Sequence, residues 1–239
     1  PTYADLLAKT GYHTGFSRKG ASPSKHTYRG TDPFGQRFKD FEAFLSARKK
    51  DTPFCFWYGS GAPHRPYFLN SGKTSGLNTE NLVLPPGLPD HSIVRNDLLD
   101  YYATVQVFDL EASTILDLLK KAGELENTLI VMSGDNGMPF PRAKATLYDT
   151  GTRVPLVVRW GKQIKGGRKV IDFVSLCDLA PTFLEAAGVA PPKAMTGRSL
   201  FAQFKSQRSG HIKASRDHVL TGMSRHCFPY PRKALRTDR

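Results

Sequence analysis

One apolar run that ends in a polar turn constrains the fold of this chain more than any other feature. Leu129-Ile130-Val131-Met132 is followed directly by Ser-Gly-Asp-Asn-Gly. A short apolar run bounded by turn residues is typical of a strand that helices cover on both faces. Asp135 and Asn136 stand where that strand ends. Because ligand sites of open α/β sheets lie at the carboxyl ends of strands, the segment predicts a fold class and one edge of a site.

The rest of the chain alternates helical and strand patterns. Helices are expected at residues 3–11, 38–49, 98–119 and 179–187, and strands at 12–17, 53–58, 128–133, 154–159 and 171–175. Residues 59–90, rich in proline and glycine, are expected to form a long loop of functional or disordered character. This alternation predicts an α/β fold with a mostly parallel sheet flanked by helices. Residues 1–200 are assigned to one domain, and 201–239, where the pattern weakens, to the start of a smaller C-terminal subdomain.

The charge balance limits the classes of partner. The chain has 34 basic and 21 acidic residues, a net charge of +13, which attracts polyanions. Nucleic acid and sulfated glycans offer the same electrostatics, but no basic-aromatic nucleic-acid motif occurs, so no nucleic acid is expected. A solvated surface without a specific partner is an equally good reading of the charge. No apolar stretch approaches the roughly 20 residues that a membrane-spanning helix needs. Cys55 and Cys177 lie in apolar runs and are expected to be buried thiols.

The residues after the central strand carry candidate chemistry. Asp135 and Asn136 offer hard oxygen donors, which suit Ca²⁺, with Mg²⁺ as the alternative, and not zinc. Lys144 follows in a polar turn that could bring an ammonium near such a metal. The tripeptide alone is more often an ordinary turn, since Asn-Gly favours positive φ.

Longer blocks add to this pattern. N-T-L-I-V-M-S-G-D-N-G and K-A-T-L-Y-D-T-G-T-R-V-P-L resemble the C-terminal half of the catalytic domain of type I, formylglycine-dependent sulfatases of the alkaline phosphatase superfamily. T-Y-A-D-L-L-A-K-T-G-Y-H-T-G, P-F-C-F-W-Y-G-S-G-A-P-H-R-P-Y, D-L-A-P-T-F-L-E-A-A-G and M-T-G-R-S-L resemble further blocks of that family, in the family's order. M-P-F-P, P-H-R-P and P-Y-P-R-K-A-L-R-T look most like its sulfamidase (heparan N-sulfatase) branch.

The resemblance implies roles for seven residues. Lys19, His64 and Lys144 match the family's catalytic lysine, histidine and sulfate-binding basic residue, and Asp135 and Asn136 match two ligands of its Ca²⁺. Arg225 and His226 lie in a region that borders the substrate pocket of the sulfamidase-like branch, although a basic surface turn explains them equally well. Arg18 and Ala21 depart from the family pattern around the lysine, where a glycine usually comes first.

The resemblance also implies what this chain lacks. The family's formylglycine and two further aspartate ligands are expected upstream of Pro1, so the isolated chain is expected to be inactive. The implied activity is hydrolysis of sulfate esters or sulfamates on sulfated saccharides, with a periplasmic, secreted or lysosomal location and an oligomeric state that the sequence does not specify. A phosphatase or phosphodiesterase of the same superfamily and a non-catalytic module that binds sulfated glycans are the alternatives.

Overall fold

The computed structural model describes residues 1–21, 30, 32–224 and 230–238, and its centre is a small parallel sheet. Strand β1 (His13–Arg18) lies between β2 (Gln36–Arg37) and β3 (Phe54–Gly59). β1 and β3 run parallel over their whole length, with His13 opposite Phe54 and Arg18 opposite Gly59. Both strands therefore end at the same edge of the sheet.

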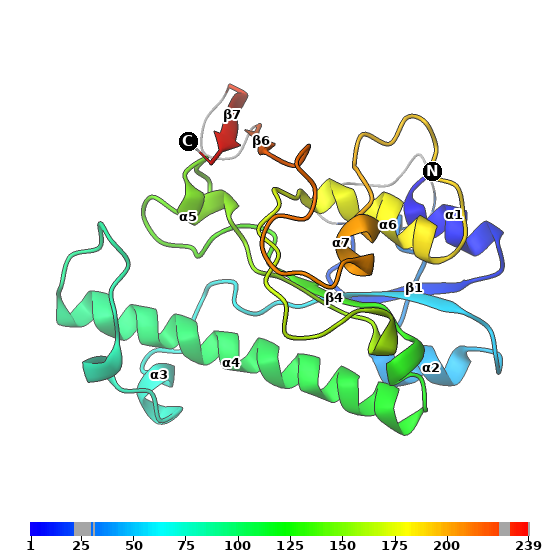
Figure 1. Cartoon of the computed structure of the whole chain (residues 1–239). Helices are drawn as coiled ribbons and strands as arrows, with labels where there is room; N and C mark the ends of the chain where they lie inside the picture. The colour runs from blue at the N-terminus through cyan, green and yellow to red at the C-terminus, as the bar shows by residue number, and fades with distance from the viewer. Residues whose placement is uncertain (22–29, 31, 225–229, 239) are drawn as a thin grey trace.

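Helices cover both faces of this sheet (Figure 1). On one face, α1 (Tyr3–Lys9) contacts α6 (Leu179–Ala186), and the Tyr3 and Phe183 rings lie 5.3 Å apart. The other face carries α2 (Phe41–Ala47) and α4 (Ser92–Lys121), whose apolar residues form one cluster with Phe54 and Phe56 of β3. Burial on both faces explains why the strands read as apolar runs.

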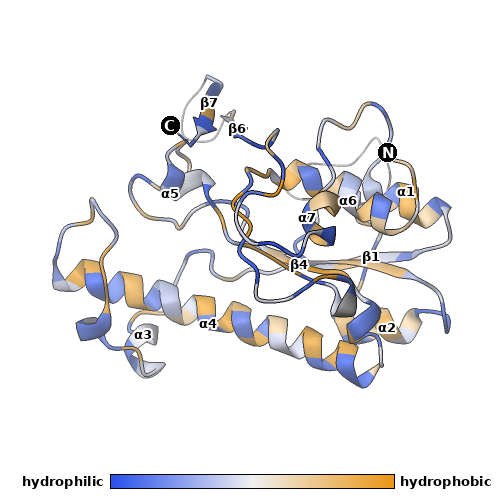
Figure 2. Ribbon diagram, viewed as in Figure 1, coloured by the Kyte–Doolittle hydropathy of each residue, from blue (hydrophilic) through white to orange (hydrophobic). Residues whose placement is uncertain are grey.

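The helix boundaries follow from local chemistry. Thr2 and Asp5 form a reciprocal cap at the start of α1, and Gly11, at φ +92°, lies just beyond its end. The helix predicted at 38–49 begins at Phe41, because the Asp40 side chain accepts a hydrogen bond from the Ala43 amide and caps it there. The long helix predicted at 98–119 begins earlier, at Ser92, and α4 has 30 residues with alternating polar and apolar sides (Figure 2).

The chain between β3 and α4 is anchored although it is mostly irregular. It contains α3 (Ser71–Thr74) and the 3₁₀ turn η1 (Thr79–Asn81). The buried carboxylate of Asp100 on α4 accepts the backbone amides of Asn70 at 3.0 Å and Gly72 at 2.8 Å. A buried acid with two amide donors thus fixes this long segment onto α4.

The strand predicted at 128–133 is present as β4 (Ile130–Ser133), and it pairs with β5 (Leu156–Arg159). This pair is antiparallel, with Ile130 opposite Arg159, so the strands of this chain are not all parallel. Ile130 nevertheless joins the same apolar cluster as β3, which places β4 beside the parallel strands. The α/β class with helices around a parallel sheet is confirmed.

The remaining elements are short. They are the 3₁₀ turns η2 (Leu125–Asn127), η3 (Gly161–Gln163) and η4 (Leu176–Asp178), the helices α5 (Asp149–Thr152) and α7 (Phe201–Lys205), and the antiparallel hairpin of β6 (His218–Met223) and β7 (Arg232–Thr237).

The strand predicted at 171–175 is wrong. Within this segment the Ile171 amide donates to the Gly210 carbonyl and the Phe173 amide donates to the Arg216 carbonyl, but no strand ladder forms. The Asp172 side chain instead turns inward and accepts hydrogen bonds from the amides of Ile212 and Lys213. The expectation of a buried thiol at Cys177 is also wrong, since this residue is exposed in η4. Cys55 is partly accessible, yet burial raises the pKa of its thiol to about 12.

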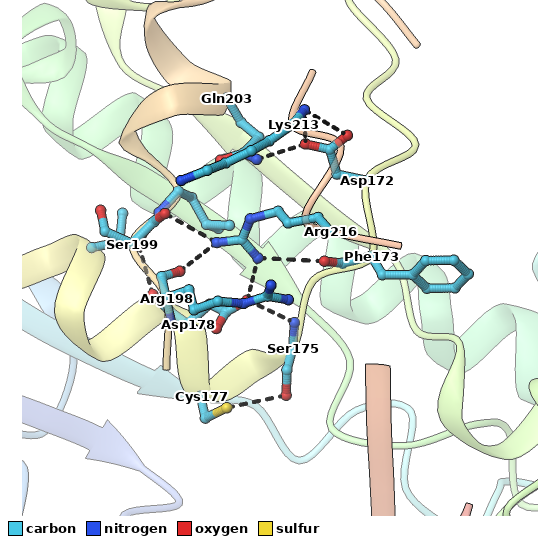
Figure 3. Close-up of polar contacts among 12 residues, drawn as sticks. Asp172, Phe173, Ser175, Cys177, Asp178, Arg198, Ser199, Gln203, Lys213 and Arg216 are labelled. Carbon is cyan, nitrogen blue, oxygen red and sulfur yellow. Dashed lines mark hydrogen bonds and ion pairs between the residues drawn. The ribbon is translucent and has the colours of Figure 1, made fainter. Parts of the chain in front are cut away.

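A buried polar network, defined here as Arg216, Asp178, Asp172 and their partners, joins residues 172–216 to one another (Figure 3). Arg216 is only 2% exposed and lies 2.7 Å from Asp178. Its guanidinium also donates to the carbonyl oxygens of Phe173, Arg198 and Ser199. Every partner of this buried cation is supplied by the chain itself.

Candidate functional site

The carboxyl ends of β1 and β3 bring Lys19 next to the loop that carries His64. The Lys19 amide donates to the Gly59 carbonyl at 2.9 Å, and the Trp57 indole donates to the Lys19 carbonyl at 3.0 Å. A Cβ atom on Gly59 would lie 2.0 Å from the Lys19 carbonyl oxygen, so only glycine fits there. The backbone of Lys19 is thus fixed, while its side chain is exposed.

Arg18 occupies a backbone conformation that favours glycine. Its φ is +61°, in the left-handed region, at the position where the family usually has glycine. Its guanidinium lies 3.2 Å from Glu111 of α4, and Glu111 accepts the Ser60 hydroxyl at 2.6 Å. Arg18 thus adopts a conformation that glycine reaches more easily, and its side chain forms an ion pair.

His64 lies in the loop after β3 with its ring exposed. Its Nδ1 lies 2.5 Å from the Arg65 carbonyl oxygen, and its amide donates to Gly61. Because a carbonyl oxygen can only accept, Nδ1 carries the proton in this contact. Nε2 is therefore the atom of the neutral ring that can accept a proton, and of the charged ring the atom that can donate one.

Arg65 connects the His64 loop to the segment after the D-N-G sequence. Its guanidinium contacts Asp97 of α4 with two hydrogen bonds of 2.9 and 2.5 Å and donates to the Pro139 carbonyl at 3.3 Å. The same group lies over the rings of Tyr67, at 4.6 Å, and Phe140, at 5.0 Å. Its hydrogen bonds with Asp97 raise the pKa of Arg65 above its ordinary value. Sequence reasoning missed this role, although P-H-R-P contains the residue, because its partners are distant in the chain.

Asp135 and Asn136 follow β4 directly. The side-chain carboxamide of Asn136 donates to one carboxylate oxygen of Asp135, and Asp135 is exposed. The glycine that follows is required for a reason that the sequence did not show. Gly137 does not have positive φ, but a Cβ atom there would lie 1.8 Å from the Thr150 carbonyl oxygen. The interpretation of Asn-Gly as an ordinary turn with positive φ is therefore wrong.

The backbone of Lys144 returns to the segment that directly follows the D-N-G sequence. Its amide donates to the Met138 carbonyl at 3.0 Å, and its side chain is partly buried. Arg142 and Ala145 on either side have φ of +62° and +63°. Left-handed conformations at residues other than glycine cost free energy and often lie at functional sites.

Hydrogen bonds therefore connect the four candidate segments. Lys19 contacts the start of the His64 loop, Arg65 contacts Pro139, and Lys144 contacts Met138. Arg225 and His226 lie outside the described residues. The C-terminal hairpin still reaches this region, since Arg236 of β7 lies 2.8 Å from Asp149 of α5. The roles of all seven predicted residues stay predictions.

The donor set fits half of a calcium site. Asp135 and Asn136 offer a carboxylate and a carboxamide oxygen, the hard donors that Ca²⁺ and Mg²⁺ prefer. Within the part of the chain that the structure describes, no group of three or more His, Cys, Asp or Glu side chains could hold a metal ion. Since Ca²⁺ takes about six to eight oxygen ligands, the remaining ones would have to come from water, substrate or other residues.

The sequence comparisons assign the family. Residues 35–189 match the family model described as Sulfatase, so the chain belongs to the sulfatase family. It is 30% identical over 188 residues to an ulvan-active sulfatase of Formosa agariphila, covering 78% of this chain and 31% of that protein. It is 32% identical over 143 residues to human N-sulphoglucosamine sulphohydrolase, covering 53% and 27%. An extracellular sulfatase of Drosophila melanogaster is 35% identical over 124 residues, covering 49% and 11%.

Solved structures share the fold. One sulfatase-fold protein, solved in complex with its substrate D-glucosamine-2-N,6-O-disulfate, matches with a TM-score of 0.75 and 20% identity, covering 98% of this chain and 71% of that one. A phosphonate monoester hydrolase of Silicibacter pomeroyi matches with a TM-score of 0.63 and 17% identity, covering 93% and 64%. The chain spans about a third of the length of the curated relatives that it matches first. Among the described residues, no helix has the length and apolarity to span a membrane.

Proposed function

We propose that this chain is part of an enzyme that hydrolyses sulfate esters or sulfamates of sulfated saccharides. One observation carries the proposal: residues that match the family's sulfate-binding and metal-binding positions follow strand ends whose loops contact one another. The relatives that act on ulvan and N-sulphoglucosamine support a saccharide substrate. The structure solved with a disulfated glucosamine supports the same class.

The chain's own residues would bind and orient the sulfate. Lys19 and Lys144 would donate charge-assisted hydrogen bonds to sulfate oxygens, which are stronger than hydrogen bonds between neutral groups. His64, whose Nδ1 is held by the Arg65 carbonyl, would present Nε2 to the oxygen or nitrogen of the leaving group and give it a proton. Its imidazole would have to be charged to do so.

Two groups would complete the site. Asp135 and Asn136 would hold Ca²⁺, or Mg²⁺, which supplies positive charge that stabilises the anionic sulfate. The family resemblance assigns the nucleophile to a formylglycine outside this chain. Because both groups come from elsewhere or need further ligands, the isolated chain is proposed to be inactive.

The test uses the intact protein that contains this chain. Turnover of an arylsulfate and of an N-sulfated and a 6-O-sulfated glucosamine would be measured for His64→Ala and Lys144→Ala. We expect kcat to fall by about 10²–10⁴-fold for His64→Ala, the usual contribution of general acid–base catalysis. We expect about 10²–10³-fold for Lys144→Ala, as for removal of one group that stabilises the transition state. Lys73→Ala and Lys193→Ala, which change exposed lysines on other elements, are controls. Unchanged rates in both site variants would refute these assignments.

A phosphatase or phosphodiesterase is the alternative that the fold leaves open. The phosphonate monoester hydrolase has the same fold, and sulfate, phosphate and phosphonate groups are all tetrahedral oxyanions. The intact protein would be assayed on matched aryl sulfate, phosphate and phosphonate esters, with metal analysis. Preference for the phosphorus esters, together with two bound zinc ions, would favour the alternative.

The location is proposed from the relatives. The Drosophila relative is an extracellular sulfatase, which supports a periplasmic, secreted or lysosomal place for the intact protein. Fractionation of cells that express the intact protein would test this, and recovery in the cytosol alone would contradict it.

A further inference from the structure

Two segments that contain none of the predicted site residues concentrate positive charge. Residues 162–169 read K-Q-I-K-G-G-R-K and residues 205–213 read K-S-Q-R-S-G-H-I-K, and neither contains Asp or Glu. Their exposed cations are Lys165, Lys169, Lys205, Arg208 and Lys213, here called the basic strip. None of the five forms an ion pair with a carboxylate of the described chain.

Hydrogen bonds hold these segments side by side. The Gly210 amide donates to the Lys169 carbonyl at 2.8 Å, and the Ile171 amide donates to the Gly210 carbonyl at 3.2 Å. Arg168 stands between them, and its guanidinium donates to the carbonyl oxygens of Lys165, Gln203 and Arg208. Arg168 therefore holds the two segments of the strip together. Of the five exposed cations, Lys165 donates a long hydrogen bond of 3.5 Å to the Gln207 carbonyl and Lys205 lies 5.8 Å from the centre of the Phe201 ring, while none is paired with an acid among the described residues.

The nearest acidic side chain is already engaged. Asp172 is buried and accepts hydrogen bonds from Gln203, Ile212 and Lys213. His211, next to the strip, lies 3.5 Å from both Asp172 and Asp238. These two acids therefore lie beside the end of the strip that carries His211.

Strand direction separates the start of the segment 162–169 from the predicted metal ligands. β5 runs antiparallel to β4, with Arg159 opposite Ile130. Residues after Arg159 therefore leave the sheet at the amino end of β4, whereas Asp135 and Asn136 follow its carboxyl end. The segment 162–169 therefore begins at the end of the strand pair opposite to the predicted metal ligands.

We propose that the basic strip binds the chain of a sulfated polysaccharide at a place distinct from the candidate catalytic site. The choice of this polyanion rests on the proposed function. Along the strip, no described aromatic side chain is among the large exposed apolar ones, so bases would find no stacking platform. A polymer with regularly spaced sulfates needs only spaced cations, and binding by charge alone would depend strongly on salt.

The test measures binding without turnover. Binding of the full chain to immobilised heparin and to size-matched desulfated heparin would be measured over a series of salt concentrations. A strip variant, Lys165→Gln, Lys169→Gln, Arg208→Gln and Lys213→Gln, would be compared with a control variant, Lys49→Gln, Lys50→Gln, Lys73→Gln and Lys193→Gln. Both remove four exposed charges, so their net charges are equal. Circular dichroism would verify that both fold.

We expect the strip variant to lose at least 10-fold in affinity for heparin and to show a shallower salt dependence. The control variant should lose less than 3-fold. Equal losses in the two variants would show that the charge acts diffusely and would overturn the proposal. Equal or tighter binding to single-stranded RNA, lost in the same variant, would overturn the choice of partner.

Turnover separates this proposal from the proposed function. In the intact protein, the strip variant should keep the wild-type rate on a monosaccharide sulfate and lose rate on the polymer at low concentration. Loss of both rates would place the strip in the catalytic site and overturn the proposal. An intact protein with no sulfatase activity would refute the proposed function, while the heparin comparison would still decide the strip.

Discussion

The polar side chains around Arg216 and those at the carboxyl ends of the strands differ in where their partners come from. In the network, Arg216 and Asp178 are buried and bonded to each other and to backbone groups of the same chain. At the strand ends, the side chains of Lys19 and His64 are exposed, and the exposed carboxylate of Asp135 accepts a hydrogen bond from its neighbour Asn136.

This difference separates the polar residues that stabilise the fold from those that are accessible to a ligand. A buried charge is stable only when it is paired, and in the network Arg216 and Asp178 pair with each other and with backbone groups of the chain. At the strand ends, hydrogen bonds to the carbonyl oxygens of Gly59, Met138 and Pro139 hold the loops in place. The side chains of Lys19 and His64 stay accessible. Three of the five non-glycine residues with left-handed φ in the described chain also lie there: Arg18, Arg142 and Ala145. Such conformations cost free energy and often lie at functional sites.

The largest effect is expected from Arg216→Ala. The substitution leaves the Asp178 carboxylate buried without its cation and three carbonyl oxygens without a donor. We expect the free energy of unfolding to fall by about 3–5 kcal/mol, which is a large part of a typical total of about 5–15 kcal/mol. Urea denaturation would measure it. Arg236→Ala, which removes the exposed pair with Asp149, is the control and should lose much less. Equal losses would show that burial does not distinguish these two ion pairs.

A smaller effect, on function more than stability, is expected from Arg65→Met. The substitution keeps the side-chain length and the carbonyl that holds His64 but removes the contacts with Asp97 and Pro139. We expect faster hydrogen exchange at 61–67 and 138–140. In the intact protein, kcat/KM should fall on the order of 10- to 100-fold, since a small misplacement of a catalytic group costs about that much.

Arg95→Met is the matched control, because Arg95 pairs with Asp90 near the other end of the same loop. It should speed exchange near residues 79–90 and leave 138–140 unchanged. Unchanged exchange at 138–140 in Arg65→Met would show that Arg65 does not connect the two loops.

The smallest effect is expected at Arg18. Arg18→Gly relieves a left-handed conformation, a gain of about 1 kcal/mol, but removes an exposed ion pair with Glu111 worth up to about 1 kcal/mol. Its net change should therefore be close to zero. Arg18→Ala removes the ion pair and keeps the strain, so it should be less stable than Arg18→Gly by about 1 kcal/mol. Thermal unfolding would compare the two, and an alanine variant as stable as the glycine variant would contradict the conformation.

Local patterns predicted the elements that their own residues define. The helix at 179–187 was placed from Asp178 and Pro181, and α6 spans Leu179–Ala186. The strands at 12–17 and 53–58 correspond to β1 and β3: the first follows the glycine that ends α1, and the second is an apolar, aromatic run that helices cover. The prediction of a strand at 171–175 failed because the residues of this segment do not by themselves set its hydrogen bonds. The segment looks like a strand, but its hydrogen bonds depend on Asp172 and on residues 210–216, which no local pattern reveals.

The candidate site shows the same division between local and distant contacts. The residue types and their order along the chain singled out Lys19, His64, Asp135, Asn136 and Lys144. The contacts that join their loops were not predictable, because Arg65 meets Pro139 and Asp97, and Gly137 meets Thr150, only after the chain folds.

The sequence by itself determined the α/β class, most elements and the family, because periodicity, capping residues and motif order are local properties. Only the tertiary structure decided that β4 and β5 run antiparallel and that residues 162–169 lie beside 205–213. It also decided that Arg216 is buried while Arg18 and Arg208 are exposed. The physical reason is that pairing and burial depend on segments far apart in the chain, whose meeting no single segment encodes.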